Sequence, residues 1–521
     1  MENLLVLLVA LSAFVATATG HIQPDHESSK ANAHRIFNAV HSATRQWGSS
    51  LIHNGFSFFP ATMPRGTLTY HGSLDSHSPT GPEWLAFEVE HAQIFAQAWL
   101  LNVVQSPVRD QKLLTKSSSV QHDLQGYLHT YQANRDLNLL YVDGMSAGKS
   151  DLGTLDSQDL VLLAAHPHKT PNLSPIDEMF RAKHICELIT SWGYDGFMRM
   201  EMGFEIIYCD FNNGLNLVGI TPTANRASSG KAAYTTTPQW ARAAAERYDG
   251  VGGDRIRLDF SSMVSGFFFP INVSSTDPHR PDLPRLGAAE ASQLMDIKSH
   301  LHTVSLRDRA YNTNWQAIVD MIVSRFTARF NLMASPRTCL QDFVHEIFVS
   351  TGTYHGITPT RRAGQEDEEK GNRTAEAVEL CTKHYLLPTH LDRQAWTLED
   401  SLIHTAVETV TSDICNTLFL IRALMLDTDA SLEDSVEHSH MIRSDVGLQG
   451  ALQKGRQLLL DLRQRLSWPV FKKPPVCAVD EMILTPMWPI GDAEDFWHPD
   501  CQPLDKIVFN RGDYWREHDK I

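Results

Sequence analysis

Hydrophobic and polar positions follow short, changing patterns along the first half of the chain. Apolar residues at helical spacing predict a helix over residues 32–50, and an aromatic loop is expected to follow it at 54–64. Short apolar runs predict strands at 67–71, 84–87, 137–142, 204–211 and 215–220, the last two paired with each other. Longer runs with a period of 3.6 predict helices at 90–104 and 176–192. Strands and helices do not alternate in a regular β-α-β rhythm, so we expect an α+β fold rather than a doubly wound sheet.

From about residue 291 the pattern becomes helical. It predicts helices at 311–333, 340–349, 398–426 and 448–466, with Thr397 and Asp400 placed to cap the third of them. The charged segment 361–376, RRAGQEDEEKGNRTAE, is predicted to be a solvated loop. We therefore expect four parts, which are a leader at 1–20, an α+β domain at 21–290, a mostly helical domain at 291–466 and an irregular Pro/Trp-rich tail at 467–521.

The first twenty residues, MENLLVLLVALSAFVATATG, have the pattern of a secretory signal peptide. An apolar run is followed by small residues that suit cleavage after Gly20, although the segment before it lacks Lys and Arg. The alternative is an uncleaved membrane anchor, but the run is shorter than the roughly 20 residues that span a bilayer. No later segment is predicted to be long and apolar enough to span a membrane. The sequence thus predicts an exported, extracellular protein.

Charge and cysteine content are informative about partners and redox environment. The formal net charge of −16 disfavours nonspecific binding to nucleic acid or to an anionic membrane surface. The seven cysteines include no Cys-x-x-Cys pair, which favours up to three disulfides and one free thiol in an exported protein. Cys477 and Cys501, both in the tail, are the best candidate pair. We expect no nucleic acid partner and no membrane contact after leader cleavage.

Three Asn-x-Ser/Thr sequences make the chain a candidate glycoprotein. Asn372 lies in the charged segment predicted to be exposed, and Asn272 lies in an irregular, Pro-containing region. Asn172 is followed by Leu-Ser-Pro, and the proline is expected to weaken it as an acceptor. Asn372 is therefore the strongest of the three predicted glycosylation sites.

Several motifs that carry chemistry in other proteins are incomplete here. A phosphate-binding loop has the pattern Gly-x-x-x-x-Gly-Lys-Ser/Thr. Here only three residues separate Gly144 from Gly148-Lys149-Ser150, so the loop is one residue short and a surface turn is expected. The histidine groups lack the spacing of a zinc helix, and no metal site is predicted. No Gly-x-Ser-x-Gly elbow is present, which leaves an α/β-hydrolase without support.

Three segments form a longer pattern together. They are YHGS from Tyr70, WLAFEVEHAQIFA from Trp84, and GYDGFMRMEMGFEIIYCDF from Gly193. In order and spacing they resemble the signature of the ADP-ribosyltransferase fold. In that family a first strand ends in Tyr-His-Gly, a second runs into a helix, and a strand after Tyr-Asp-Gly carries the catalytic glutamate. The resemblance covers about residues 65–220 and implies an ADP-ribosyltransferase-like α+β domain followed by a mostly helical region.

The resemblance also implies roles for individual residues. Glu205 would stabilise the oxocarbenium-like transition state as the nicotinamide–ribose bond of NAD breaks, and His71 would bind the adenosine-side ribose. The backbone of Gly72 would pair with the carboxamide, while Trp84, or Phe87 as second choice, would stack on the nicotinamide ring.

Two departures from the family pattern weaken these assignments. Trp84 is larger than the usual Tyr, and Gly203 stands where arginine-modifying relatives carry a second Glu or Gln. Glu201 lies two positions further back and is a weak candidate for that role.

Two functions remain open from the residues alone. The first is a secreted enzyme that cleaves NAD, as its substrate, and transfers ADP-ribose to an unknown protein acceptor or hydrolyses it. The second is a non-enzymatic secreted accessory or interaction protein that keeps a degenerate ADP-ribosyltransferase scaffold. The enzyme requires that His71, Trp84 and Glu205 converge on one cleft.

Overall fold

The computed structural model describes most of the chain. The described residues are 21–96, 125–150, 152–165, 177–223, 240–278, 280–355, 369–438, 440–474, 476–487 and 490–507. The predicted leader and Asn172 lie outside these ranges.

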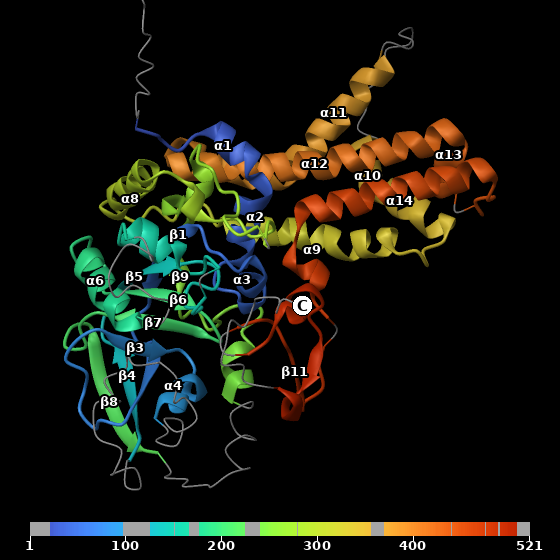
Figure 1. The fold of residues 1–521 in the computed structure, drawn as a ribbon. Helices are drawn as coiled ribbons and strands as arrows, with labels where there is room; N and C mark the ends of the chain where they lie inside the picture. The colour runs from blue at the N-terminus through green and yellow to red at the C-terminus, as the bar shows by residue number, and fades with distance from the viewer. Residues whose placement is uncertain are drawn as a thin grey trace, which may run out of the picture.

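A single large sheet forms the centre of the N-terminal half (Figure 1). Its strands are β1 Ser57–Met63, β2 Leu68–Ser73, β3 Glu83–Ala86, β4 Tyr127–Ala133, β5 Leu137–Val142, β6 Gly196–Met200, β7 Phe204–Tyr208, β8 Leu215–Pro222, β9 Arg257–Leu258 and β10 Val264–Ser265. The strand order is β10-β1-β5-β6-β7-β3-β2-β4-β8, and β9 pairs beside β10 along β1. Neighbouring strands are antiparallel except β5 and β6, which are parallel. The mixed α+β class predicted from the sequence is confirmed.

Several helices of the N-terminal half accompany the sheet. They are α1 His26–Ala31, α2 Ala33–Ser42, α3 Gln46–Ile52, α4 Val89–Phe95, the π-helix η2 Ser157–Leu162 and α6 Glu178–Thr190. Short 3-10 turns follow at η3 Phe260–Ser262, η4 Gly266–Phe268 and η5 Leu286–Ala288. Helix α4 packs directly on β2. Gly72 permits this contact, because a Cβ there would lie 1.8 Å from the Ala92 carbonyl oxygen.

Three predictions for this half are wrong in detail. The expected aromatic loop at 54–64 contains β1, a buried strand near one end of the sheet. The single helix expected at 32–50 is two helices, separated where Thr44 adopts a positive φ of 59°. Strand β8 pairs with β4 rather than with β7, and β4 and β6 were not predicted at all.

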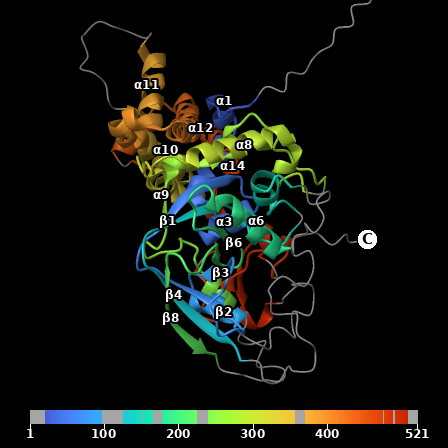
Figure 2. The ribbon, with the colours of Figure 1, turned by 90° about the vertical axis from the view of Figure 1, so that its left-hand side faces the viewer.

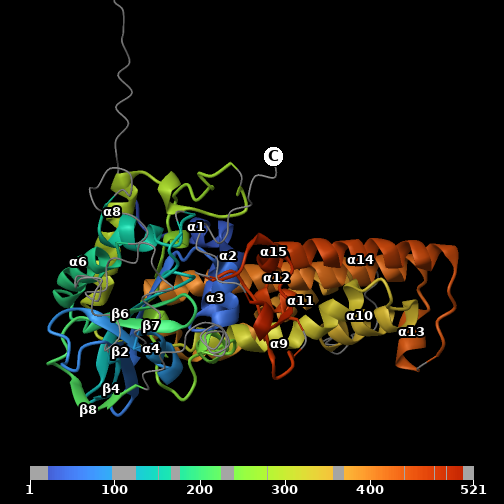
Figure 3. The same cartoon turned by 60° about the horizontal axis from the view of Figure 1, so that its bottom comes forward.

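The C-terminal half is an elongated layer of helices that lies beside the sheet and extends beyond it (Figures 1 and 2). Its helices are α8 Ala291–Ser305, α9 Trp315–Ala334, α10 Leu340–His355, α11 Glu369–Lys383, the 3-10 helix η6 His384–Ala395, α12 Leu398–Thr428, α13 Leu432–Glu437 and α14 Val446–Leu466. Figure 3 shows α14 lying along α12, with α9 and α10 nearby. The predicted cap of α12 is confirmed, because the Asp400 amide donates to Thr397 Oγ1 at 3.1 Å.

Helix α11 corrects the loop predicted at 361–376, because its backbone is helical from Glu369. Asn372 falls at its first turn, where only the backbone is described. Asn272 lies in an exposed, irregular segment, as expected of an acceptor for glycosylation.

Helix α12 satisfies, by length and composition alone, the requirements for crossing a membrane, with a mean hydropathy of 1.3 in its most apolar window. The sequence-based expectation that no later segment would do so is therefore wrong. However, 56% of that window is buried inside the protein, the pattern of a core helix. Its packing partners include α2, α11 and α14.

One continuous hydrophobic core connects the two halves. It includes side chains from α2, from the sheet and from α12 and α14, and the stacked pair Phe37 and Trp468, 5.6 Å apart, belongs to it. The tail after α14 consists of η7 Pro469–Lys472, β11 Glu481–Ile483, α15 Ala493–Trp497, β12 Cys501–Pro503 and η8 Leu504–Lys506. It returns toward the sheet, where the Tyr248 hydroxyl donates to the Ile483 carbonyl at 3.2 Å. The sheet-rich and helical parts, which meet near residue 290, thus share one hydrophobic core.

Three disulfides are present, as the cysteine count predicted. Cys477–Cys501 is the pair expected in the tail, and the other two are Cys186–Cys209 and Cys381–Cys415. Cys339 is the free, exposed thiol. The first bridge joins α6 to the end of β7, and the second joins α11 to α12.

Replacement of Gly72 by Ala tests the close packing of α4 on β2. Because the new methyl group would meet the Ala92 carbonyl, we expect Gly72→Ala to lower the free energy of unfolding by roughly 1–3 kcal/mol in urea titrations. Gly219 in β8 is the matched control, since nothing lies within 4 Å of its missing Cβ and Gly219→Ala should not destabilise the protein. Equal unfolding midpoints for the two variants would contradict the packing role of Gly72.

Candidate functional site

The three segments that carry the ADP-ribosyltransferase resemblance become adjacent strands. β7 pairs with β3 and β3 pairs with β2, so that Glu205 lies opposite Ala86 and Ala86 lies opposite Tyr70. Tyr70 and Ala86 are 16 positions apart along the chain and Ala86 and Glu205 are 119 apart, yet the three strands are neighbours in the sheet.

The side chains of His71 and Glu205 nevertheless point to opposite faces of the sheet. Residues paired across antiparallel strands share a face, so Glu205 lies on the side of Tyr70, and His71 lies on the other side. Gly72, on the Glu205 side, is covered by α4. The structure therefore does not bring His71 and Glu205 into one cleft.

His71 belongs to an aromatic cluster on its own face. Its ring lies 5.5 Å from that of His129 and 5.9 Å from that of Phe211, and its Nδ1–H donates to the Trp84 carbonyl at 2.8 Å. Burial lowers the pKa of His71 to about 4, so its imidazole is neutral at ordinary pH. These contacts describe a packed core histidine.

The two aromatic candidates differ in accessibility. Trp84 shares the face of Glu205 and is half-buried, with its side chain packed against the core. Phe87 is only 2% exposed and lies beneath the guanidinium of Arg255, 5.5 Å from the ring centroid. Phe87 is therefore part of the core, and of the two only Trp84 has accessible ring surface.

Glu205 is held by a buried arginine. Arg199, its partner across β6 and β7, donates from Nε to Oε1 of Glu205 at 2.8 Å and is itself fully buried. Arg199 also contacts Glu178 at the start of α6 and donates to Oε1 of Gln158 in η2 at 3.1 Å. Burial alone would lower the pKa of Arg199, but the Glu178 and Glu205 carboxylates outweigh it and hold that pKa above its usual range.

A second buried arginine continues the network toward the π-helix. Arg181 in α6 donates from two nitrogens to the Asp159 carboxylate, at 2.8 and 2.9 Å, and lies 3.6 Å from Glu178. The residue Asp159 is 1% exposed, and burial raises its pKa against the opposing effect of Arg181. Since a buried charge is costly without partners, these ion pairs fix η2 and α6 against β6.

Lys149 and Glu201 complete the network at the ends of β5 and β6. Lys149 Nζ lies 3.4 Å from Oε2 of Glu201, whose other oxygen has no hydrogen-bond partner within the described residues. Burial raises the pKa of Glu201 to about 8, so its carboxyl is largely protonated at neutral pH. His91 of α4 faces the same region, and burial lowers its pKa.

We call this set the buried ion network. It consists of seven charged side chains, Lys149, Asp159, Glu178, Arg181, Arg199, Glu201 and Glu205. With Glu201 protonated, three carboxylates balance three cations. The side chains of Lys149, Glu201 and Glu205 are 11–13% exposed, so the network opens only narrowly to solvent. Its arrangement suits the fixing of strands more than the binding of a substrate.

Most members of the buried ion network were not predicted. The sequence feature that could have indicated the network is Arg199, a charged residue within the otherwise apolar run FMRM, which forms most of β6. The surface turn predicted for the incomplete phosphate-loop motif is wrong in its exposure, because residues 144–148 are buried and the Lys149 side chain, 13% exposed, contacts Glu201. In the tail, Cys477, Glu481 and Cys501 lie close together and are residue types that can bind metals. The two sulfurs are bonded to each other in a disulfide, however.

The raised pKa of Glu201 predicts a pH dependence of stability. Between about pH 4.5 and 8 the folded protein holds a proton that the unfolded chain releases, so the free energy of unfolding falls as pH rises through this window. Glu201→Gln removes this contribution. The decrease in the free energy of unfolding between pH 5 and pH 8, measured by urea titrations at pH 5, 6.5 and 8, should therefore be smaller in the variant by on the order of 3 kcal/mol.

Two comparisons make this prediction specific. Burial also raises the pKa of Asp143 to about 7 and of Asp495 to about 6, but both groups remain in the variant and cancel in the difference. Glu187→Gln, at an exposed position of α6, should leave the pH profile unchanged. A profile of Glu201→Gln that parallels the unmodified protein would contradict a neutral, buried Glu201.

The chain resembles a family and two yeast proteins. Residues 26–100 and 102–230 match the model of the YPL277C N-terminal domain. The uncharacterized protein YOR389W of Saccharomyces cerevisiae is 24% identical over 552 aligned positions, which cover 90% of this chain and 84% of that protein. The uncharacterized protein YPL277C of the same yeast is 34% identical over 210 positions, 35% of this chain and 41% of that protein. No solved structure matches the chain. The family match thus spans strands β1–β8 and all seven residues of the buried ion network.

Proposed function

We propose that the chain is an exported, non-enzymatic accessory or interaction protein that keeps a degenerate ADP-ribosyltransferase scaffold. The observation that carries this proposal is the ion pair between Glu205 and the fully buried Arg199, at 2.8 Å. A carboxylate that stabilises an oxocarbenium-like transition state must direct its charge at the substrate. Here Arg199 already neutralises that charge.

The position of the other candidate residues supports the same function. His71 lies on the face opposite Glu205, among His129 and Phe211. The backbone of Gly72 is paired with Leu128 of β4 and lies beneath α4, so a nicotinamide carboxamide has no approach to it. The contacts that NAD would need with His71 and with the backbone of Gly72 are therefore not available on the Glu205 face.

Export is part of the proposal and rests on two features of the sequence and structure. The first twenty residues have the pattern of a cleavable leader. Three disulfides bridge six of the seven cysteines, which is typical of proteins that fold in an oxidising compartment. The partner proposed here is another extracellular protein, with no nucleic acid or membrane involved.

NAD cleavage is the second candidate function. It is favoured by one observation, the adjacency of β2, β3 and β7, which places Trp84 and Glu205 on the same face. In that case NAD would be the substrate, and ADP-ribose would pass to water or to a protein acceptor.

Assays of the mature protein with NAD separate the two functions. We expect no release of nicotinamide by the unmodified protein, because Glu205 is committed to Arg199. We also expect Glu205→Gln to lower the free energy of unfolding by about 3 kcal/mol, since it leaves a buried guanidinium without one of its counter-charges.

An exposed position supplies the control for this experiment. Glu437→Gln, in the short helix α13, should change neither stability nor activity. Turnover of NAD that disappears in a Glu205→Gln variant of normal stability would overturn the proposal and establish the second candidate.

A further inference from the structure

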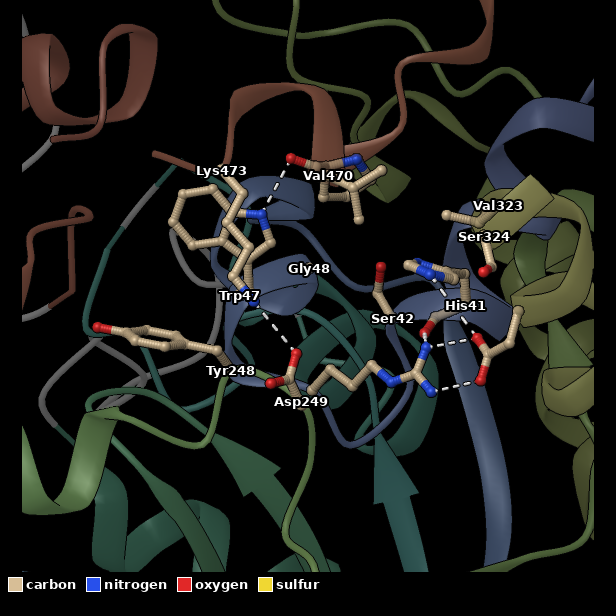
Figure 4. A pocket seen from close by; sticks show the side chains of 13 residues that line it. His41, Ser42, Trp47, Gly48, Tyr248, Asp249, Val323, Ser324, Val470 and Lys473 are labelled. Atoms are coloured by element: carbon tan, nitrogen blue, oxygen red, sulfur yellow. Dashed lines mark hydrogen bonds and ion pairs between the residues drawn. The ribbon is translucent and has the colours of Figure 1, made fainter. Parts of the chain in front are cut away.

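A cavity of about 270 Å³ lies where the two halves of the molecule meet (Figure 4). Its walls come from α2 and α3, from the segment around Tyr248, from α9 and from the start of the tail at η7. It is separate from the buried ion network and shares no residue with it. It is also smaller than the roughly 300–1,000 Å³ of sites for drug-sized ligands.

The charged side chains of this cavity form two ion pairs, and the pair of Lys473 with Asp249 lies at its solvent-facing edge, since the Asp249 side chain is 94% exposed. Arg45 donates from both terminal nitrogens to Asp320, each at 2.6 Å, and Lys473 Nζ lies 3.1 Å from Asp249. Burial, reinforced by the nearby Arg45, lowers the pKa of His41 to about 4, so this third group is neutral at ordinary pH. The wall is therefore rich in donors and acceptors but carries no net charge.

Two aromatic rings provide the apolar part of the wall. Trp47 and Tyr248 meet edge to face, with ring centroids 6.1 Å apart. Both are held in place by the tail, because Trp47 Nε1 donates at 2.9 Å to the carbonyl of Pro469, itself a lining residue, and the Tyr248 hydroxyl donates to the Ile483 carbonyl. The rings are thus fixed before any ligand binds.

Ser42 is a buried polar group that lacks a partner at this wall. Its side chain is directed toward the centre of the cavity in Figure 4, the residue is 2% exposed, and its hydroxyl has no hydrogen-bond partner in the described part of the chain. Gly48 makes room for it, because a Cβ at Gly48 would lie 2.1 Å from Ser42 Oγ. An unmet buried hydroxyl costs on the order of 1–3 kcal/mol, which a ligand could recover.

We propose that this cavity binds a single neutral sugar ring, the size of one hexose. Ring hydroxyls can accept from Arg45 and Lys473 and donate to Asp320 and Asp249 without breaking either ion pair. One further hydroxyl can pair with Ser42, while the C–H face of the sugar packs on Tyr248, which is partly exposed and backed by the buried Trp47. A free anion or cation fits less well, because each charged group of the wall already has its counter-charge.

This inference goes beyond the proposed interaction function and does not depend on whether the sheet binds NAD. It gives the molecule a ligand of defined chemistry, placed at the junction that connects α2 and α3 to the helical half. Because no residue of the cavity belongs to the Glu205 region, the two hypotheses fail separately.

Saturation-transfer NMR on the mature protein tests the sugar site. The protein is produced in a bacterial periplasm, where disulfides form and no N-glycan competes. D-glucose, D-mannose, D-galactose and N-acetyl-D-glucosamine are titrated, with zwitterionic glycine and anionic acetate as probes that carry ionised groups. We expect saturable binding of at least one sugar and of neither ionised probe. Intrinsic fluorescence is less suitable, since the chain has 11 Trp residues.

Matched variants locate the binding. Ser42→Ala should weaken the sugar at least fivefold and Lys473→Met about tenfold. Ser50→Ala removes a hydroxyl that is 1% exposed and equally unpartnered within the described residues, but lies outside the cavity, and it should leave affinity unchanged. Lys454→Met, on the exposed side of α14, is the control for charge.

Circular dichroism melts establish that each variant is folded before its affinity is compared. The proposal is overturned if no sugar of the panel binds, if glycine or acetate binds in preference to the sugars, or if folded Ser42→Ala and Lys473→Met bind as well as their controls.

Discussion

The fully buried guanidinium of Arg199 is the constraint on which the sheet-rich half depends. Its carboxylate partners come from the neighbouring strand β7 and from α6, and a glutamine of the π-helix completes its contacts. A buried charge is tolerated only where such partners surround it, so these three elements cannot move independently. Arg181 and Asp159 form a second fully buried ion pair, which joins α6 to the π-helix.

The same constraint determines what the Glu205 face can do. A carboxylate bound to Arg199 is well placed to stabilise the sheet and poorly placed to stabilise a cationic transition state. Helix α4 covers Gly72 on this face, while His71 is packed on the other. The strands β2, β3 and β7, which carry the resemblance, are therefore neighbours in the sheet, whereas their candidate side chains have structural partners. This is the physical basis for proposing a scaffold without NAD chemistry.

The two halves of the protein are not independent bodies. Helices α1 and α2, at the beginning of the described chain, pack on α12, and the tail after α14 returns to the sheet-rich half. Trp468 stacks on Phe37 across this junction. The proposed sugar cavity lies beside these contacts, and its rings are held by backbone carbonyls of the tail. Any ligand there would contact both halves at once, which links its binding to their relative position.

Features that depend on local periodicity and composition could be predicted from the amino-acid sequence. It predicted four of the long C-terminal helices, the cap at Thr397, the Cys477–Cys501 bridge and the strands around His71 and Glu205, because each follows from spacing within one segment. It did not predict β1, since Pro60 and the aromatic residues around it also suit a loop, and only pairing with β5 decides for a strand. Likewise, the separation of His71 from Glu205 and the commitment of Glu205 to Arg199 were decided by the tertiary structure. Strand register and the packing of α4 set which face each side chain occupies, and residues more than a hundred positions apart specify them only when the sheet is assembled.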